Sequence, residues 1–312
     1  MHKLTLAHSP DSDDLVMWWP ICGMTLDDGS PIAGDLGKPA IDTGGFEFVP
    51  MAEDVEVLNR RAIEAGDLDI TAISAHTYPY IRDRYRITDC GGSFGEGYGP
   101  KVVVRQDDER FADGAAGLIG DGITVAVPGT KTTAYLTLSI LLREIDPSRT
   151  MQVVVMPFHE IIAAVQRGDA DAGLLIHEAQ LTFVDAGLRK IVDLGEWWGE
   201  ARGGALPLGL NVIRRDLDER FGDGACKKVA EILSESVEYA VSHEAESREF
   251  LKMRGDDRPE WNDDALVKKY LSMYVSGLTR SMGDAGASAL DRLLGEGAKA
   301  GLCPEPGEID VI

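Results

Sequence analysis

The sequence has few cysteines and no long apolar run. No stretch approaches the roughly 18 apolar residues that a membrane span needs. The N-terminal MHKLTLAHS leads directly into an alternating pattern, without the basic stretch and apolar segment of a secretory signal. The cysteines lie far apart and none forms a CxxC pair, so neither a disulfide framework nor a zinc site is expected. These absences favour a cytoplasmic protein with reduced thiols.

Two further motifs are absent. The sequence contains no HExxH and no GxxxxGK[ST], which argues against a zinc hydrolase and a P-loop nucleotide site. The glycine-rich GGSFGEGYG, residues 91–99, is not followed by a helix pattern as a dinucleotide site would be. We expect neither a metal nor a cofactor. The enzymatic hypothesis that remains is acid–base chemistry by a histidine in an enclosed cleft.

The charge is strongly one-sided. The chain has 31 basic and 53 acidic residues, which give a net charge of −22. Such a protein repels phosphate backbones and anionic lipid headgroups, so neither a nucleic acid nor a membrane surface is an expected partner. Long-range repulsion also slows an anionic substrate, and an anion site in this protein therefore needs strong local donors.

Strand and helix patterns alternate along most of the chain. Strands are predicted at residues 3–9, 46–51, 68–74, 123–127, 151–156, 172–176 and 188–192. Helices are predicted from residue 14, at 55–65, 133–144 and 159–167, from residue 177, and in a helical tail at 227–251, 264–275 and 285–300. This rhythm predicts an α/β fold with a mainly parallel sheet.

Two extended segments, residues 101–106 and 206–214, look like links between two α/β units. Two crossings make the first unit discontinuous. We predict a first domain of residues 1–103 plus 212–312, which carries the helical C-terminal part, and a second domain of residues 104–211. Two-lobed proteins of this plan hold a ligand in a central cleft and close on a hinge.

Polar residues follow several predicted strands, and open α/β sheets bind ligands at the carboxyl ends of their strands. The stretch SPDSDD, Ser9 to Asp14, separates the first strand from a helix. It is either a helix cap or one wall of a site, and the two interpretations are equally supported. Ser74 ends another strand and is either a turn residue or a cleft residue, with His76 as a possible base.

The turn PGTKTT, residues 128–133, precedes a predicted helix. Free backbone N–H groups and the helix dipole favour an anion at such a helix start. Thr132 and Thr133 add hydroxyl groups. We expect a carboxylate or another small anion here rather than a nucleotide phosphate.

His177 follows the apolar strand pattern AGLLI and precedes Glu178 at a predicted helix start. A helix N-terminus lowers the pKa of a nearby imidazole, which would leave His177 neutral at pH 7 and able to act as a base. The alternative is a packed histidine with a satisfied N–H, which the spacing alone slightly favours. His159 is a weaker candidate. Trp197 and Trp198 fit stacking on a ligand or, better, packing between lobes.

The chain resembles the menaquinone-biosynthesis family of the futalosine route. The stretches that carry the resemblance are HSPDSDD, LDITAISAHTYPYI, VAVPGTKTTAYL, AGLLIHEAQLTFVDAGLRKIVDLGEWW and ALPLGLNVIRRDL. They run from about residue 3 to about residue 217, and a helical tail of the expected kind follows. The series IHE, LGEWW, LPLG and RRDL is the most specific part and indicates the naphthoate-forming branch of the family.

The resemblance implies a two-lobed, periplasmic-binding-protein-like (type 2) fold that works as an enzyme. It implies that a small anionic substrate, cyclic dehypoxanthine futalosine, is cleaved to 1,4-dihydroxy-6-naphthoate and a sugar-derived fragment by a carbon–carbon lyase reaction. His177 stands where the family has its base. That base removes a proton from a hydroxyl of the ribose-derived part before a retro-aldol-like cleavage. A monomer or a homodimer is expected.

The resemblance also implies a set of substrate-binding residues, with the naphthoate carboxylate held beside the threonines. The set comprises Ala72, Ile73, Ser74, Thr132 and Thr133, with Ser9 and Asp14 from the opening wall. The chain departs from the family's SPCPND motif at Asp11, Ser12 and Asp13, and its loop Cys22–Gly45 is longer. Two alternatives stay open: a chorismate dehydratase-like sister enzyme, or a solute-binding protein for a small aromatic carboxylate.

Overall fold

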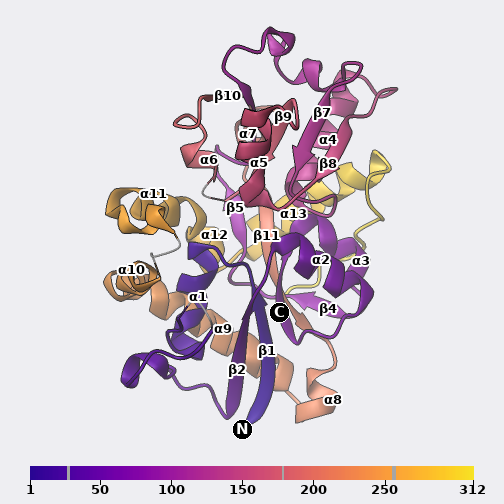
Figure 1. Ribbon diagram of the computed structural model, residues 1–312. Helices are drawn as coiled ribbons and strands as arrows, with labels where there is room; N and C mark the ends of the chain where they lie inside the picture. Colours follow the sequence, from indigo (N-terminus) through magenta and orange to yellow (C-terminus); the bar gives the residue numbers. More distant parts are fainter. Residues whose placement is uncertain (27–28, 178, 255–257) are drawn as a thin grey trace.

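A computed structural model describes residues 1–26, 29–177, 179–254 and 258–312. Its strands form two separate sheets, each accompanied by helices (Figure 1). The first sheet has the order β2-β1-β3-β11-β4, with β5 paired to β11, and the second has the order β10-β6-β9-β7-β8. We call the first sheet, with the helices before β6 and after β11, the first lobe. The second sheet and the helices between β6 and β11 are the second lobe.

Most strands and helices lie where the sequence patterns predict them, but β4, β5, α3, α7, α8 and α12 were not predicted. The first sheet contains β1 (His2–His8), β2 (Phe46–Ala52), β3 (Ile70–Ser74), β4 (Tyr85–Ile87), β5 (Ser93–Gly95) and β11 (Leu206–Arg214). The second contains β6 (Lys101–Arg105), β7 (Thr124–Val127), β8 (Gln152–Val155), β9 (Ala172–Leu175) and β10 (Leu188–Asp193). The helices are α1 (Ser12–Cys22), α2 (Val55–Glu64), α3 (Tyr78–Ile81), α4 (Thr133–Ile145), α5 (Ile161–Arg167), α6 (Ala179–Thr182), α7 (Leu194–Arg202), α8 (Leu217–Phe221), α9 (Ala225–Ser242), α10 (Glu244–Met253), α11 (Asp264–Tyr274), α12 (Gly277–Arg280) and α13 (Gly283–Lys299).

The prediction of a mainly parallel sheet is wrong, because both sheets are mixed. β1 pairs in parallel with β2 and β3, and β7 with β8 and β9. β6 and β11, the strands that link the lobes, pair antiparallel with every neighbour. A linking strand enters its sheet from the other lobe and therefore runs against the strands of the βαβ units.

The linking strands also bear on the predicted domain limits. β6 lies wholly in the second sheet and β11 wholly in the first. The chain therefore passes from the first lobe to the second just before β6 and returns to the first lobe just before β11. Both crossings lie near the predicted domain limits. The division into residues 1–103 plus 212–312 and residues 104–211 stays a prediction.

The helix predicted at 227–251 is two helices. α9 ends at Ser242 and α10 begins at Glu244, because His243 between them leaves the helical region at φ −115° and ψ 44°. The His243 ring stacks on Tyr239, with ring centroids 3.8 Å apart, and its Nδ1 lies 2.8 Å from the Tyr239 carbonyl oxygen. The local pattern of apolar residues continues through this break, which is why spacing alone did not show it.

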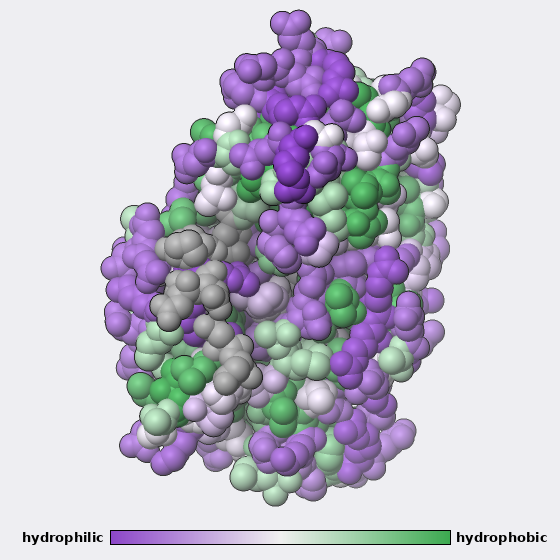
Figure 2. Space-filling view, viewed as in Figure 1, coloured by the Kyte–Doolittle hydropathy of each residue, from purple (hydrophilic) through white to green (hydrophobic). Residues whose placement is uncertain are grey.

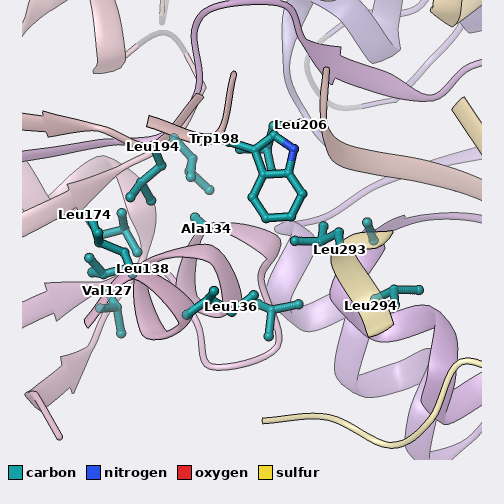
Figure 3. Packing of buried hydrophobic residues seen from close by; sticks show 14 of the residues in the cluster. Val127, Ala134, Leu136, Leu138, Leu174, Leu194, Trp198, Leu206, Leu293 and Leu294 are labelled. Carbon is teal, nitrogen blue, oxygen red and sulfur yellow. The ribbon is translucent and has the colours of Figure 1, made fainter. Parts of the chain in front are cut away.

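One hydrophobic cluster joins the two lobes. It contains Leu136 of α4 and Leu174 of β9 together with Leu206 of β11 and Leu293 of α13, and all four are fully buried. Trp198 of α7 is buried in the same cluster (Figure 3). Its neighbour Trp197 packs against the cluster, so the tryptophan pair packs between lobes, which was the favoured interpretation.

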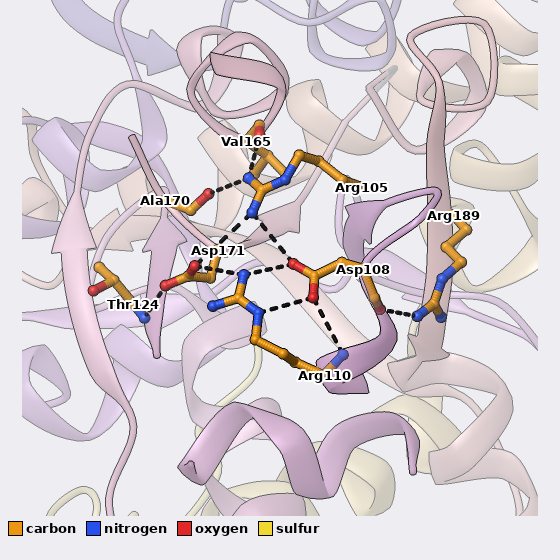
Figure 4. Close-up of polar contacts among 8 residues, drawn as sticks. All are labelled: Arg105, Asp108, Arg110, Thr124, Val165, Ala170, Asp171 and Arg189. Atoms are coloured by element: carbon orange, nitrogen blue, oxygen red, sulfur yellow. Dashed lines mark hydrogen bonds and ion pairs between the residues drawn. The ribbon is translucent and has the colours of Figure 1, made fainter. Parts of the chain in front are cut away.

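A cluster of ion pairs holds the edge of the second lobe. Arg110 pairs with Asp108 at 2.6 Å and with Asp171 at 2.8 Å, and Arg105 pairs with Asp108 at 3.2 Å (Figure 4). Arg105 also donates to the carbonyl oxygens of Val165 and Ala170. These contacts tie the segment after β6 to the loop between α5 and β9.

The surface is predominantly polar. Figure 2 shows a face covered mainly by hydrophilic residues, with hydrophobic residues in small separate patches. Within the described part of the chain, none of the helices combines the length and the apolar character needed to cross a membrane.

Glycines 95 and 99 and Gly195 allow a close crossing of two backbones. A Cβ on Gly195 would overlap the Tyr98 carbonyl, and a Cβ on Gly99 would lie 2.6 Å from the Gly195 nitrogen. The glycine-rich segment at 91–99 therefore has a packing role where the chain leaves β5 and meets the start of α7.

We expect Gly195→Ala to lower the free energy of unfolding by about 1–3 kcal/mol, because the added methyl group meets backbone atoms that cannot turn away. The matched control is Gly199→Ala in the same helix, where an added Cβ meets nothing within 4 Å. It should be neutral or stabilise by up to about 1 kcal/mol through helix propensity. Urea unfolding of both variants measures the difference, and equal stabilities would contradict the close crossing.

Candidate active site

A cavity lies between the lobes and holds about 100 Å³. Its walls come from the turn after β1 and the start of α1, the end of β3, the segment after β9, the start of α4, and β11. The proposed base and the whole predicted substrate-binding set line it: Ser9, Asp14, Ala72, Ile73, Ser74, Thr132, Thr133 and His177. These residues are far apart in the sequence, and the fold brings them to one place. Their individual roles stay predictions.

The cavity is where the parallel strands of both sheets end. β1 and β3 end at His8 and Ser74 in the first lobe, and β7 and β9 end at Val127 and Leu175 in the second. Each of these strands runs into one of the lining segments. The arrangement follows the general rule for open α/β sheets, doubled because two sheets face each other across the cleft.

The SPDSDD stretch is a wall of the cavity. The Ser9 N–H donates to Asp14 Oδ2 at 2.7 Å, and the Ser9 hydroxyl donates to Asp11 Oδ2 at 2.7 Å. Asp11 occupies the N-cap position of α1, but its side chain makes no capping hydrogen bond. The stretch therefore does more than cap the helix. Ser9 holds the carboxyl groups of Asp11 and Asp14, and both residues line the cavity.

His177 reaches this wall from the other lobe. Its Nδ1 lies 2.5 Å from Asp11 Oδ2, and its ring meets the ring of Phe158 edge-on at a centroid distance of 4.8 Å. The residue has a φ of 55°, in the left-handed region that few residues other than glycine adopt. The helix predicted to start here is only α6, Ala179–Thr182, and Glu178 lies outside the described residues. A single turn has a small dipole. The group that acts on the protonation of the His177 imidazole is therefore the carboxylate of Asp11 rather than the start of a helix.

The threonine hydroxyls at the start of α4 are occupied by protein partners. Thr132 Oγ1 donates to the Gly129 carbonyl oxygen and accepts the Tyr135 N–H, which makes it the N-cap of α4. Thr133 Oγ1 donates to the Leu208 carbonyl oxygen at 2.6 Å. Within the described chain, the backbone N–H groups of Thr133 and Ala134 have no acceptor. The donors that an anion can use here are therefore these N–H groups rather than the hydroxyls.

Ser74 is oriented by a neighbouring amide. Asn59 Oδ1 accepts the Ser74 N–H at 2.8 Å, and Asn59 Nδ2 donates to Ser74 Oγ at 3.0 Å. The serine oxygen thus acts as an acceptor toward the protein, which leaves its hydroxyl hydrogen for a ligand. Ala72 and Ile73 present their strand to the same cavity.

His76 does not belong to the cavity lining. It is buried, and burial together with the charge of Lys131 lowers its pKa to about 4. Its Nδ1 lies 3.3 Å from the Thr132 carbonyl oxygen. His76 is therefore a packed histidine beside the turn before α4, and it is not a candidate base.

Sequence reasoning missed Asp11 and Asn211. Asn211 lies on β11, lines the cavity and donates to the Gly91 carbonyl oxygen at 2.8 Å. Its Oδ1 is buried with no hydrogen-bond partner in the described chain. Nothing in the sequence around either residue distinguishes it from a cap or a strand residue. Ser93 sits in the letters GGSFG, which fit GxSxG, but it lies on β5 rather than at a strand-to-helix turn, and its Oγ accepts the Gly209 N–H.

The carboxyl groups of the wall have pKa values shifted in opposite directions. Burial raises the pKa of Asp11, but the charge and hydrogen bond of His177 and the Ser9 hydroxyl outweigh it, so the net shift is downward. Burial and then the Asp11 charge raise the pKa of Asp14 to about 7. Environments that separate two neighbouring carboxyl groups in this way are typical of sites that perform acid–base chemistry.

No lysine or arginine lines the cavity among the described residues. The described part of the chain likewise has no group of three or more histidine, cysteine or acidic side chains that could hold a metal ion. The polar groups available to a ligand are thus neutral donors, carboxyl groups and the imidazole of His177.

The fold is that of the periplasmic-binding-protein class. The Candida albicans CA3427 gene product, described as exhibiting the generic periplasmic binding protein fold, matches with a TM-score of 0.65 and 14% identity, over 100% of this chain and 96% of that one. The alkanesulfonate-binding protein SsuA from Xanthomonas axonopodis pv. citri matches with a TM-score of 0.63 and 12% identity, over 98% and 96%. These likenesses concern the fold alone, and they confirm the predicted fold class.

The chain belongs to the menaquinone biosynthesis family, whose model matches residues 4–299. A 1,4-dihydroxy-6-naphtoate synthase of Streptomyces coelicolor is 35% identical over 271 residues, 87% of each chain. One of Thermus thermophilus is 36% identical over 307 residues, 98% of each chain. Protein AF1704 from Archaeoglobus fulgidus matches with a TM-score of 0.77 and 34% identity, over 96% of this chain and 98% of that one. The predicted family is confirmed, as is the prediction of an enzyme of menaquinone biosynthesis.

The raised pKa of Asp14 predicts a pH-dependent stability. Between its ordinary value of 3.8 and about 7, this carboxyl group holds its proton in the folded chain and loses it in the unfolded chain. Its contribution therefore stabilises the fold at the acidic end and is lost as the pH rises through about 7. We expect Asp14→Asn to be more stable relative to wild type as the pH rises, by about 1.4 kcal/mol per pH unit between about 4 and 7.

Urea unfolding of wild type and Asp14→Asn at several pH values measures this difference, and the comparison cancels the contributions of other titrating groups such as His8. Asn keeps an oxygen to accept the Ser9 N–H. The control is Asp121→Asn, whose side chain is almost fully exposed. Its stability should differ from wild type by no more than about 0.5 kcal/mol at every pH. A difference for Asp14→Asn that stays constant with pH would contradict the prediction.

Proposed function

We propose that this enzyme cleaves cyclic dehypoxanthine futalosine to 1,4-dihydroxy-6-naphthoate and a sugar-derived fragment, as a carbon–carbon lyase. The observation that carries the proposal is the position of His177, which faces the predicted substrate-binding residues across an enclosed cavity. The relatives from Streptomyces coelicolor and Thermus thermophilus, both named 1,4-dihydroxy-6-naphtoate synthase, support the same activity.

In the proposed reaction, His177 acts as the general base. It takes the proton from a hydroxyl of the ribose-derived part, and the oxygen forms a carbonyl as the neighbouring C–C bond breaks in a retro-aldol-like step. The electron pair of that bond moves into the naphthalene system, and aromatisation of the second ring drives the step forward. Such a proton transfer needs the base within hydrogen-bond reach of the hydroxyl and a largely dry site. His177 is mostly buried, with 17% of its side chain exposed.

The naphthoate carboxylate is placed at the start of α4 in this proposal. The backbone N–H groups of Thr133 and Ala134 point out of the helix end, where the helix dipole favours an anion. The Ser74 hydroxyl, oriented by Asn59, adds a donor from the first lobe. Ala72 and Ile73 supply apolar contact for the ring system.

The size of the cavity indicates that the lobes separate to admit the substrate. Cavities that bind ligands of this size usually hold roughly 300 Å³ or more, whereas this one holds about 100 Å³. Hinged closure around a ligand is the usual motion of two-lobed proteins. A cytoplasmic location and a monomeric or homodimeric state stay predictions.

We expect His177→Ala to abolish turnover while it retains ligand binding, because the imidazole supplies the base and the carboxylate is held elsewhere. Turnover of cyclic dehypoxanthine futalosine is followed by chromatography and mass detection of dihydroxynaphthoate. General-base catalysis typically contributes about 10²–10⁴-fold, so the rate should fall by at least that range. Calorimetric titration with 1,4-dihydroxy-6-naphthoate should give a Kd within about threefold of wild type.

The matched control is His159→Ala. His159 lies on the rim of the second lobe, is exposed and does not line the cavity, so this variant should turn over like wild type. Product formation by His177→Ala at the wild-type rate would refute His177 as the base. A wild-type protein that binds aromatic carboxylates without forming product would indicate the solute-binding alternative, and dehydration of chorismate would indicate the sister activity.

A further inference from the structure

We propose that Asp11 is a positioning residue that accepts the Nδ1–H of His177 across the cleft, so that the base is assembled only when the two lobes meet. This inference rests on the proposed function, because it assigns His177 a partner within the same site. Asp11 belongs to the wall of the first lobe and His177 follows β9 of the second. Their contact at 2.5 Å is therefore a bond between lobes.

The side chain of Asp11 does not form the capping hydrogen bond that is usual for an aspartate at a helix N-cap. Asp54, Asp193 and Asp263 occupy the N-cap positions of α2, α7 and α11, and each accepts one or two backbone N–H groups of its helix. Asp216, the N-cap of α8, accepts none, and its carboxylate pairs with Arg214 instead. Asp11 caps α1 but accepts none. Its Oδ2 instead accepts the Ser9 hydroxyl and faces His177 Nδ1. Like Asp216, Asp11 forgoes the capping bond for another side-chain partner, and for Asp11 that partner is the imidazole of the opposite lobe.

The contact determines which nitrogen of His177 carries the proton. A carboxylate accepts hydrogen bonds and cannot donate them while it is ionised, so Nδ1 must be the protonated nitrogen. The lone pair is then on Nε2, which becomes the basic nitrogen of the neutral ring. An aspartate that holds a histidine in one tautomer in this way makes it an effective base without itself taking up the proton.

Asp11 is held in place and stays ionised. It is 2% exposed, and the Ser9 hydroxyl fixes the oxygen that faces His177. Although burial raises its pKa, His177, Ser9 and the positive charge of Arg258 bring the pKa below its ordinary value. The other titratable groups around the pair among the described residues are His8 at the end of β1, Asp13 and Asp14 on α1, and Asp54 before α2.

The backbone of His177 fits the same assignment. A φ of 55° is strained for a residue with a Cβ, and strain of this kind persists only where surrounding contacts hold it. The ring is held by Asp11 on one side and by Phe158 on the other. Asp11 therefore fixes both the orientation and the protonated nitrogen of the ring.

The experiment compares Asp11→Asn and Asp11→Ala with wild type over a range of pH. Asp11→Ala should lower kcat by about 10²–10³-fold with KM within about threefold, because the base is misplaced while substrate contacts remain. Asp11→Asn keeps an oxygen for the Nδ1–H but loses the charge. The acidic limb of its kcat/KM profile should therefore move to lower pH by about one unit or more, since a nearby carboxylate favours the imidazolium. The control is Asp263→Asn, which alters an N-cap far from the cavity and should leave kcat and the profile unchanged.

A second readout needs no substrate. The ring-nitrogen resonances of His177 in ¹⁵N-labelled protein, assigned by comparison with His177→Ala, report the tautomer of the neutral ring. Wild type should show Nδ1–H, and Asp11→Ala should lose this preference while its thermal unfolding stays cooperative. If wild type forms no dihydroxynaphthoate but the tautomer changes in Asp11→Ala, the proposed function fails and the pair stands. If Asp11→Ala keeps the wild-type kcat, pH profile and tautomer, the pairing is overturned.

Discussion

The turn before α4 is held by side chains of the opposite lobe, and the geometry of the cavity depends on this. Glu56 Oε2 accepts the Lys131 N–H at 3.0 Å, and Thr77 Oγ1 donates to the Lys131 carbonyl oxygen at 3.3 Å. Thr133 donates to Leu208 of β11. These contacts therefore fix the position of the free N–H groups at the start of α4 relative to Ser74 and the end of β3. A ligand carboxylate bound there is positioned relative to the first lobe, although α4 follows a strand of the second.

His177 meets the first lobe by a different route. It extends from the end of β9, and its Nδ1 contacts Asp11 of the first lobe. In the proposed function, the carboxylate end of the substrate and its reacting end are thus held by separate interlobe contacts, one through the backbone of α4 and one through the Asp11–His177 pair. Hinge closure would change the second contact more than the first, because α4 is also packed in the hydrophobic cluster shared by both lobes.

Local patterns predicted most strands and helices, but not β4, β5, α3, α7, α8 or α12. They placed Ser74, the threonines and His177 at the ends of strands or the starts of helices, whereas Ala72 and Ile73 came from the family resemblance. They did not predict strand direction in β6 and β11, because apolar alternation is the same for either direction. They did not predict the pairing of Asp11 with His177, which are distant in sequence and come together only when two lobes pack. They assigned the threonine hydroxyls to the ligand, whereas the fold uses those hydroxyls to cap α4 and to bind β11. The spacing of apolar residues predicts which side chains face a core. It does not predict polar contacts between residues that are distant in the sequence.

Among the described residues, no lysine or arginine lines the cavity, and the Asp11–His177 pair gives a physical reason for this. A cation placed there would attract an anionic substrate, but it would also compete with His177 for the buried carboxylate of Asp11, where attraction between charges is strong. Backbone N–H groups attract a carboxylate without that competition, because they carry only partial charges and cannot move. The raised pKa of Asp14 acts in the same direction, since a protonated neighbour adds no second negative charge beside the substrate. In the proposed function, the ionised carboxylate of Asp11 serves the base and neutral backbone donors serve the ligand, which would let an anion bind within a chain whose net charge is −22.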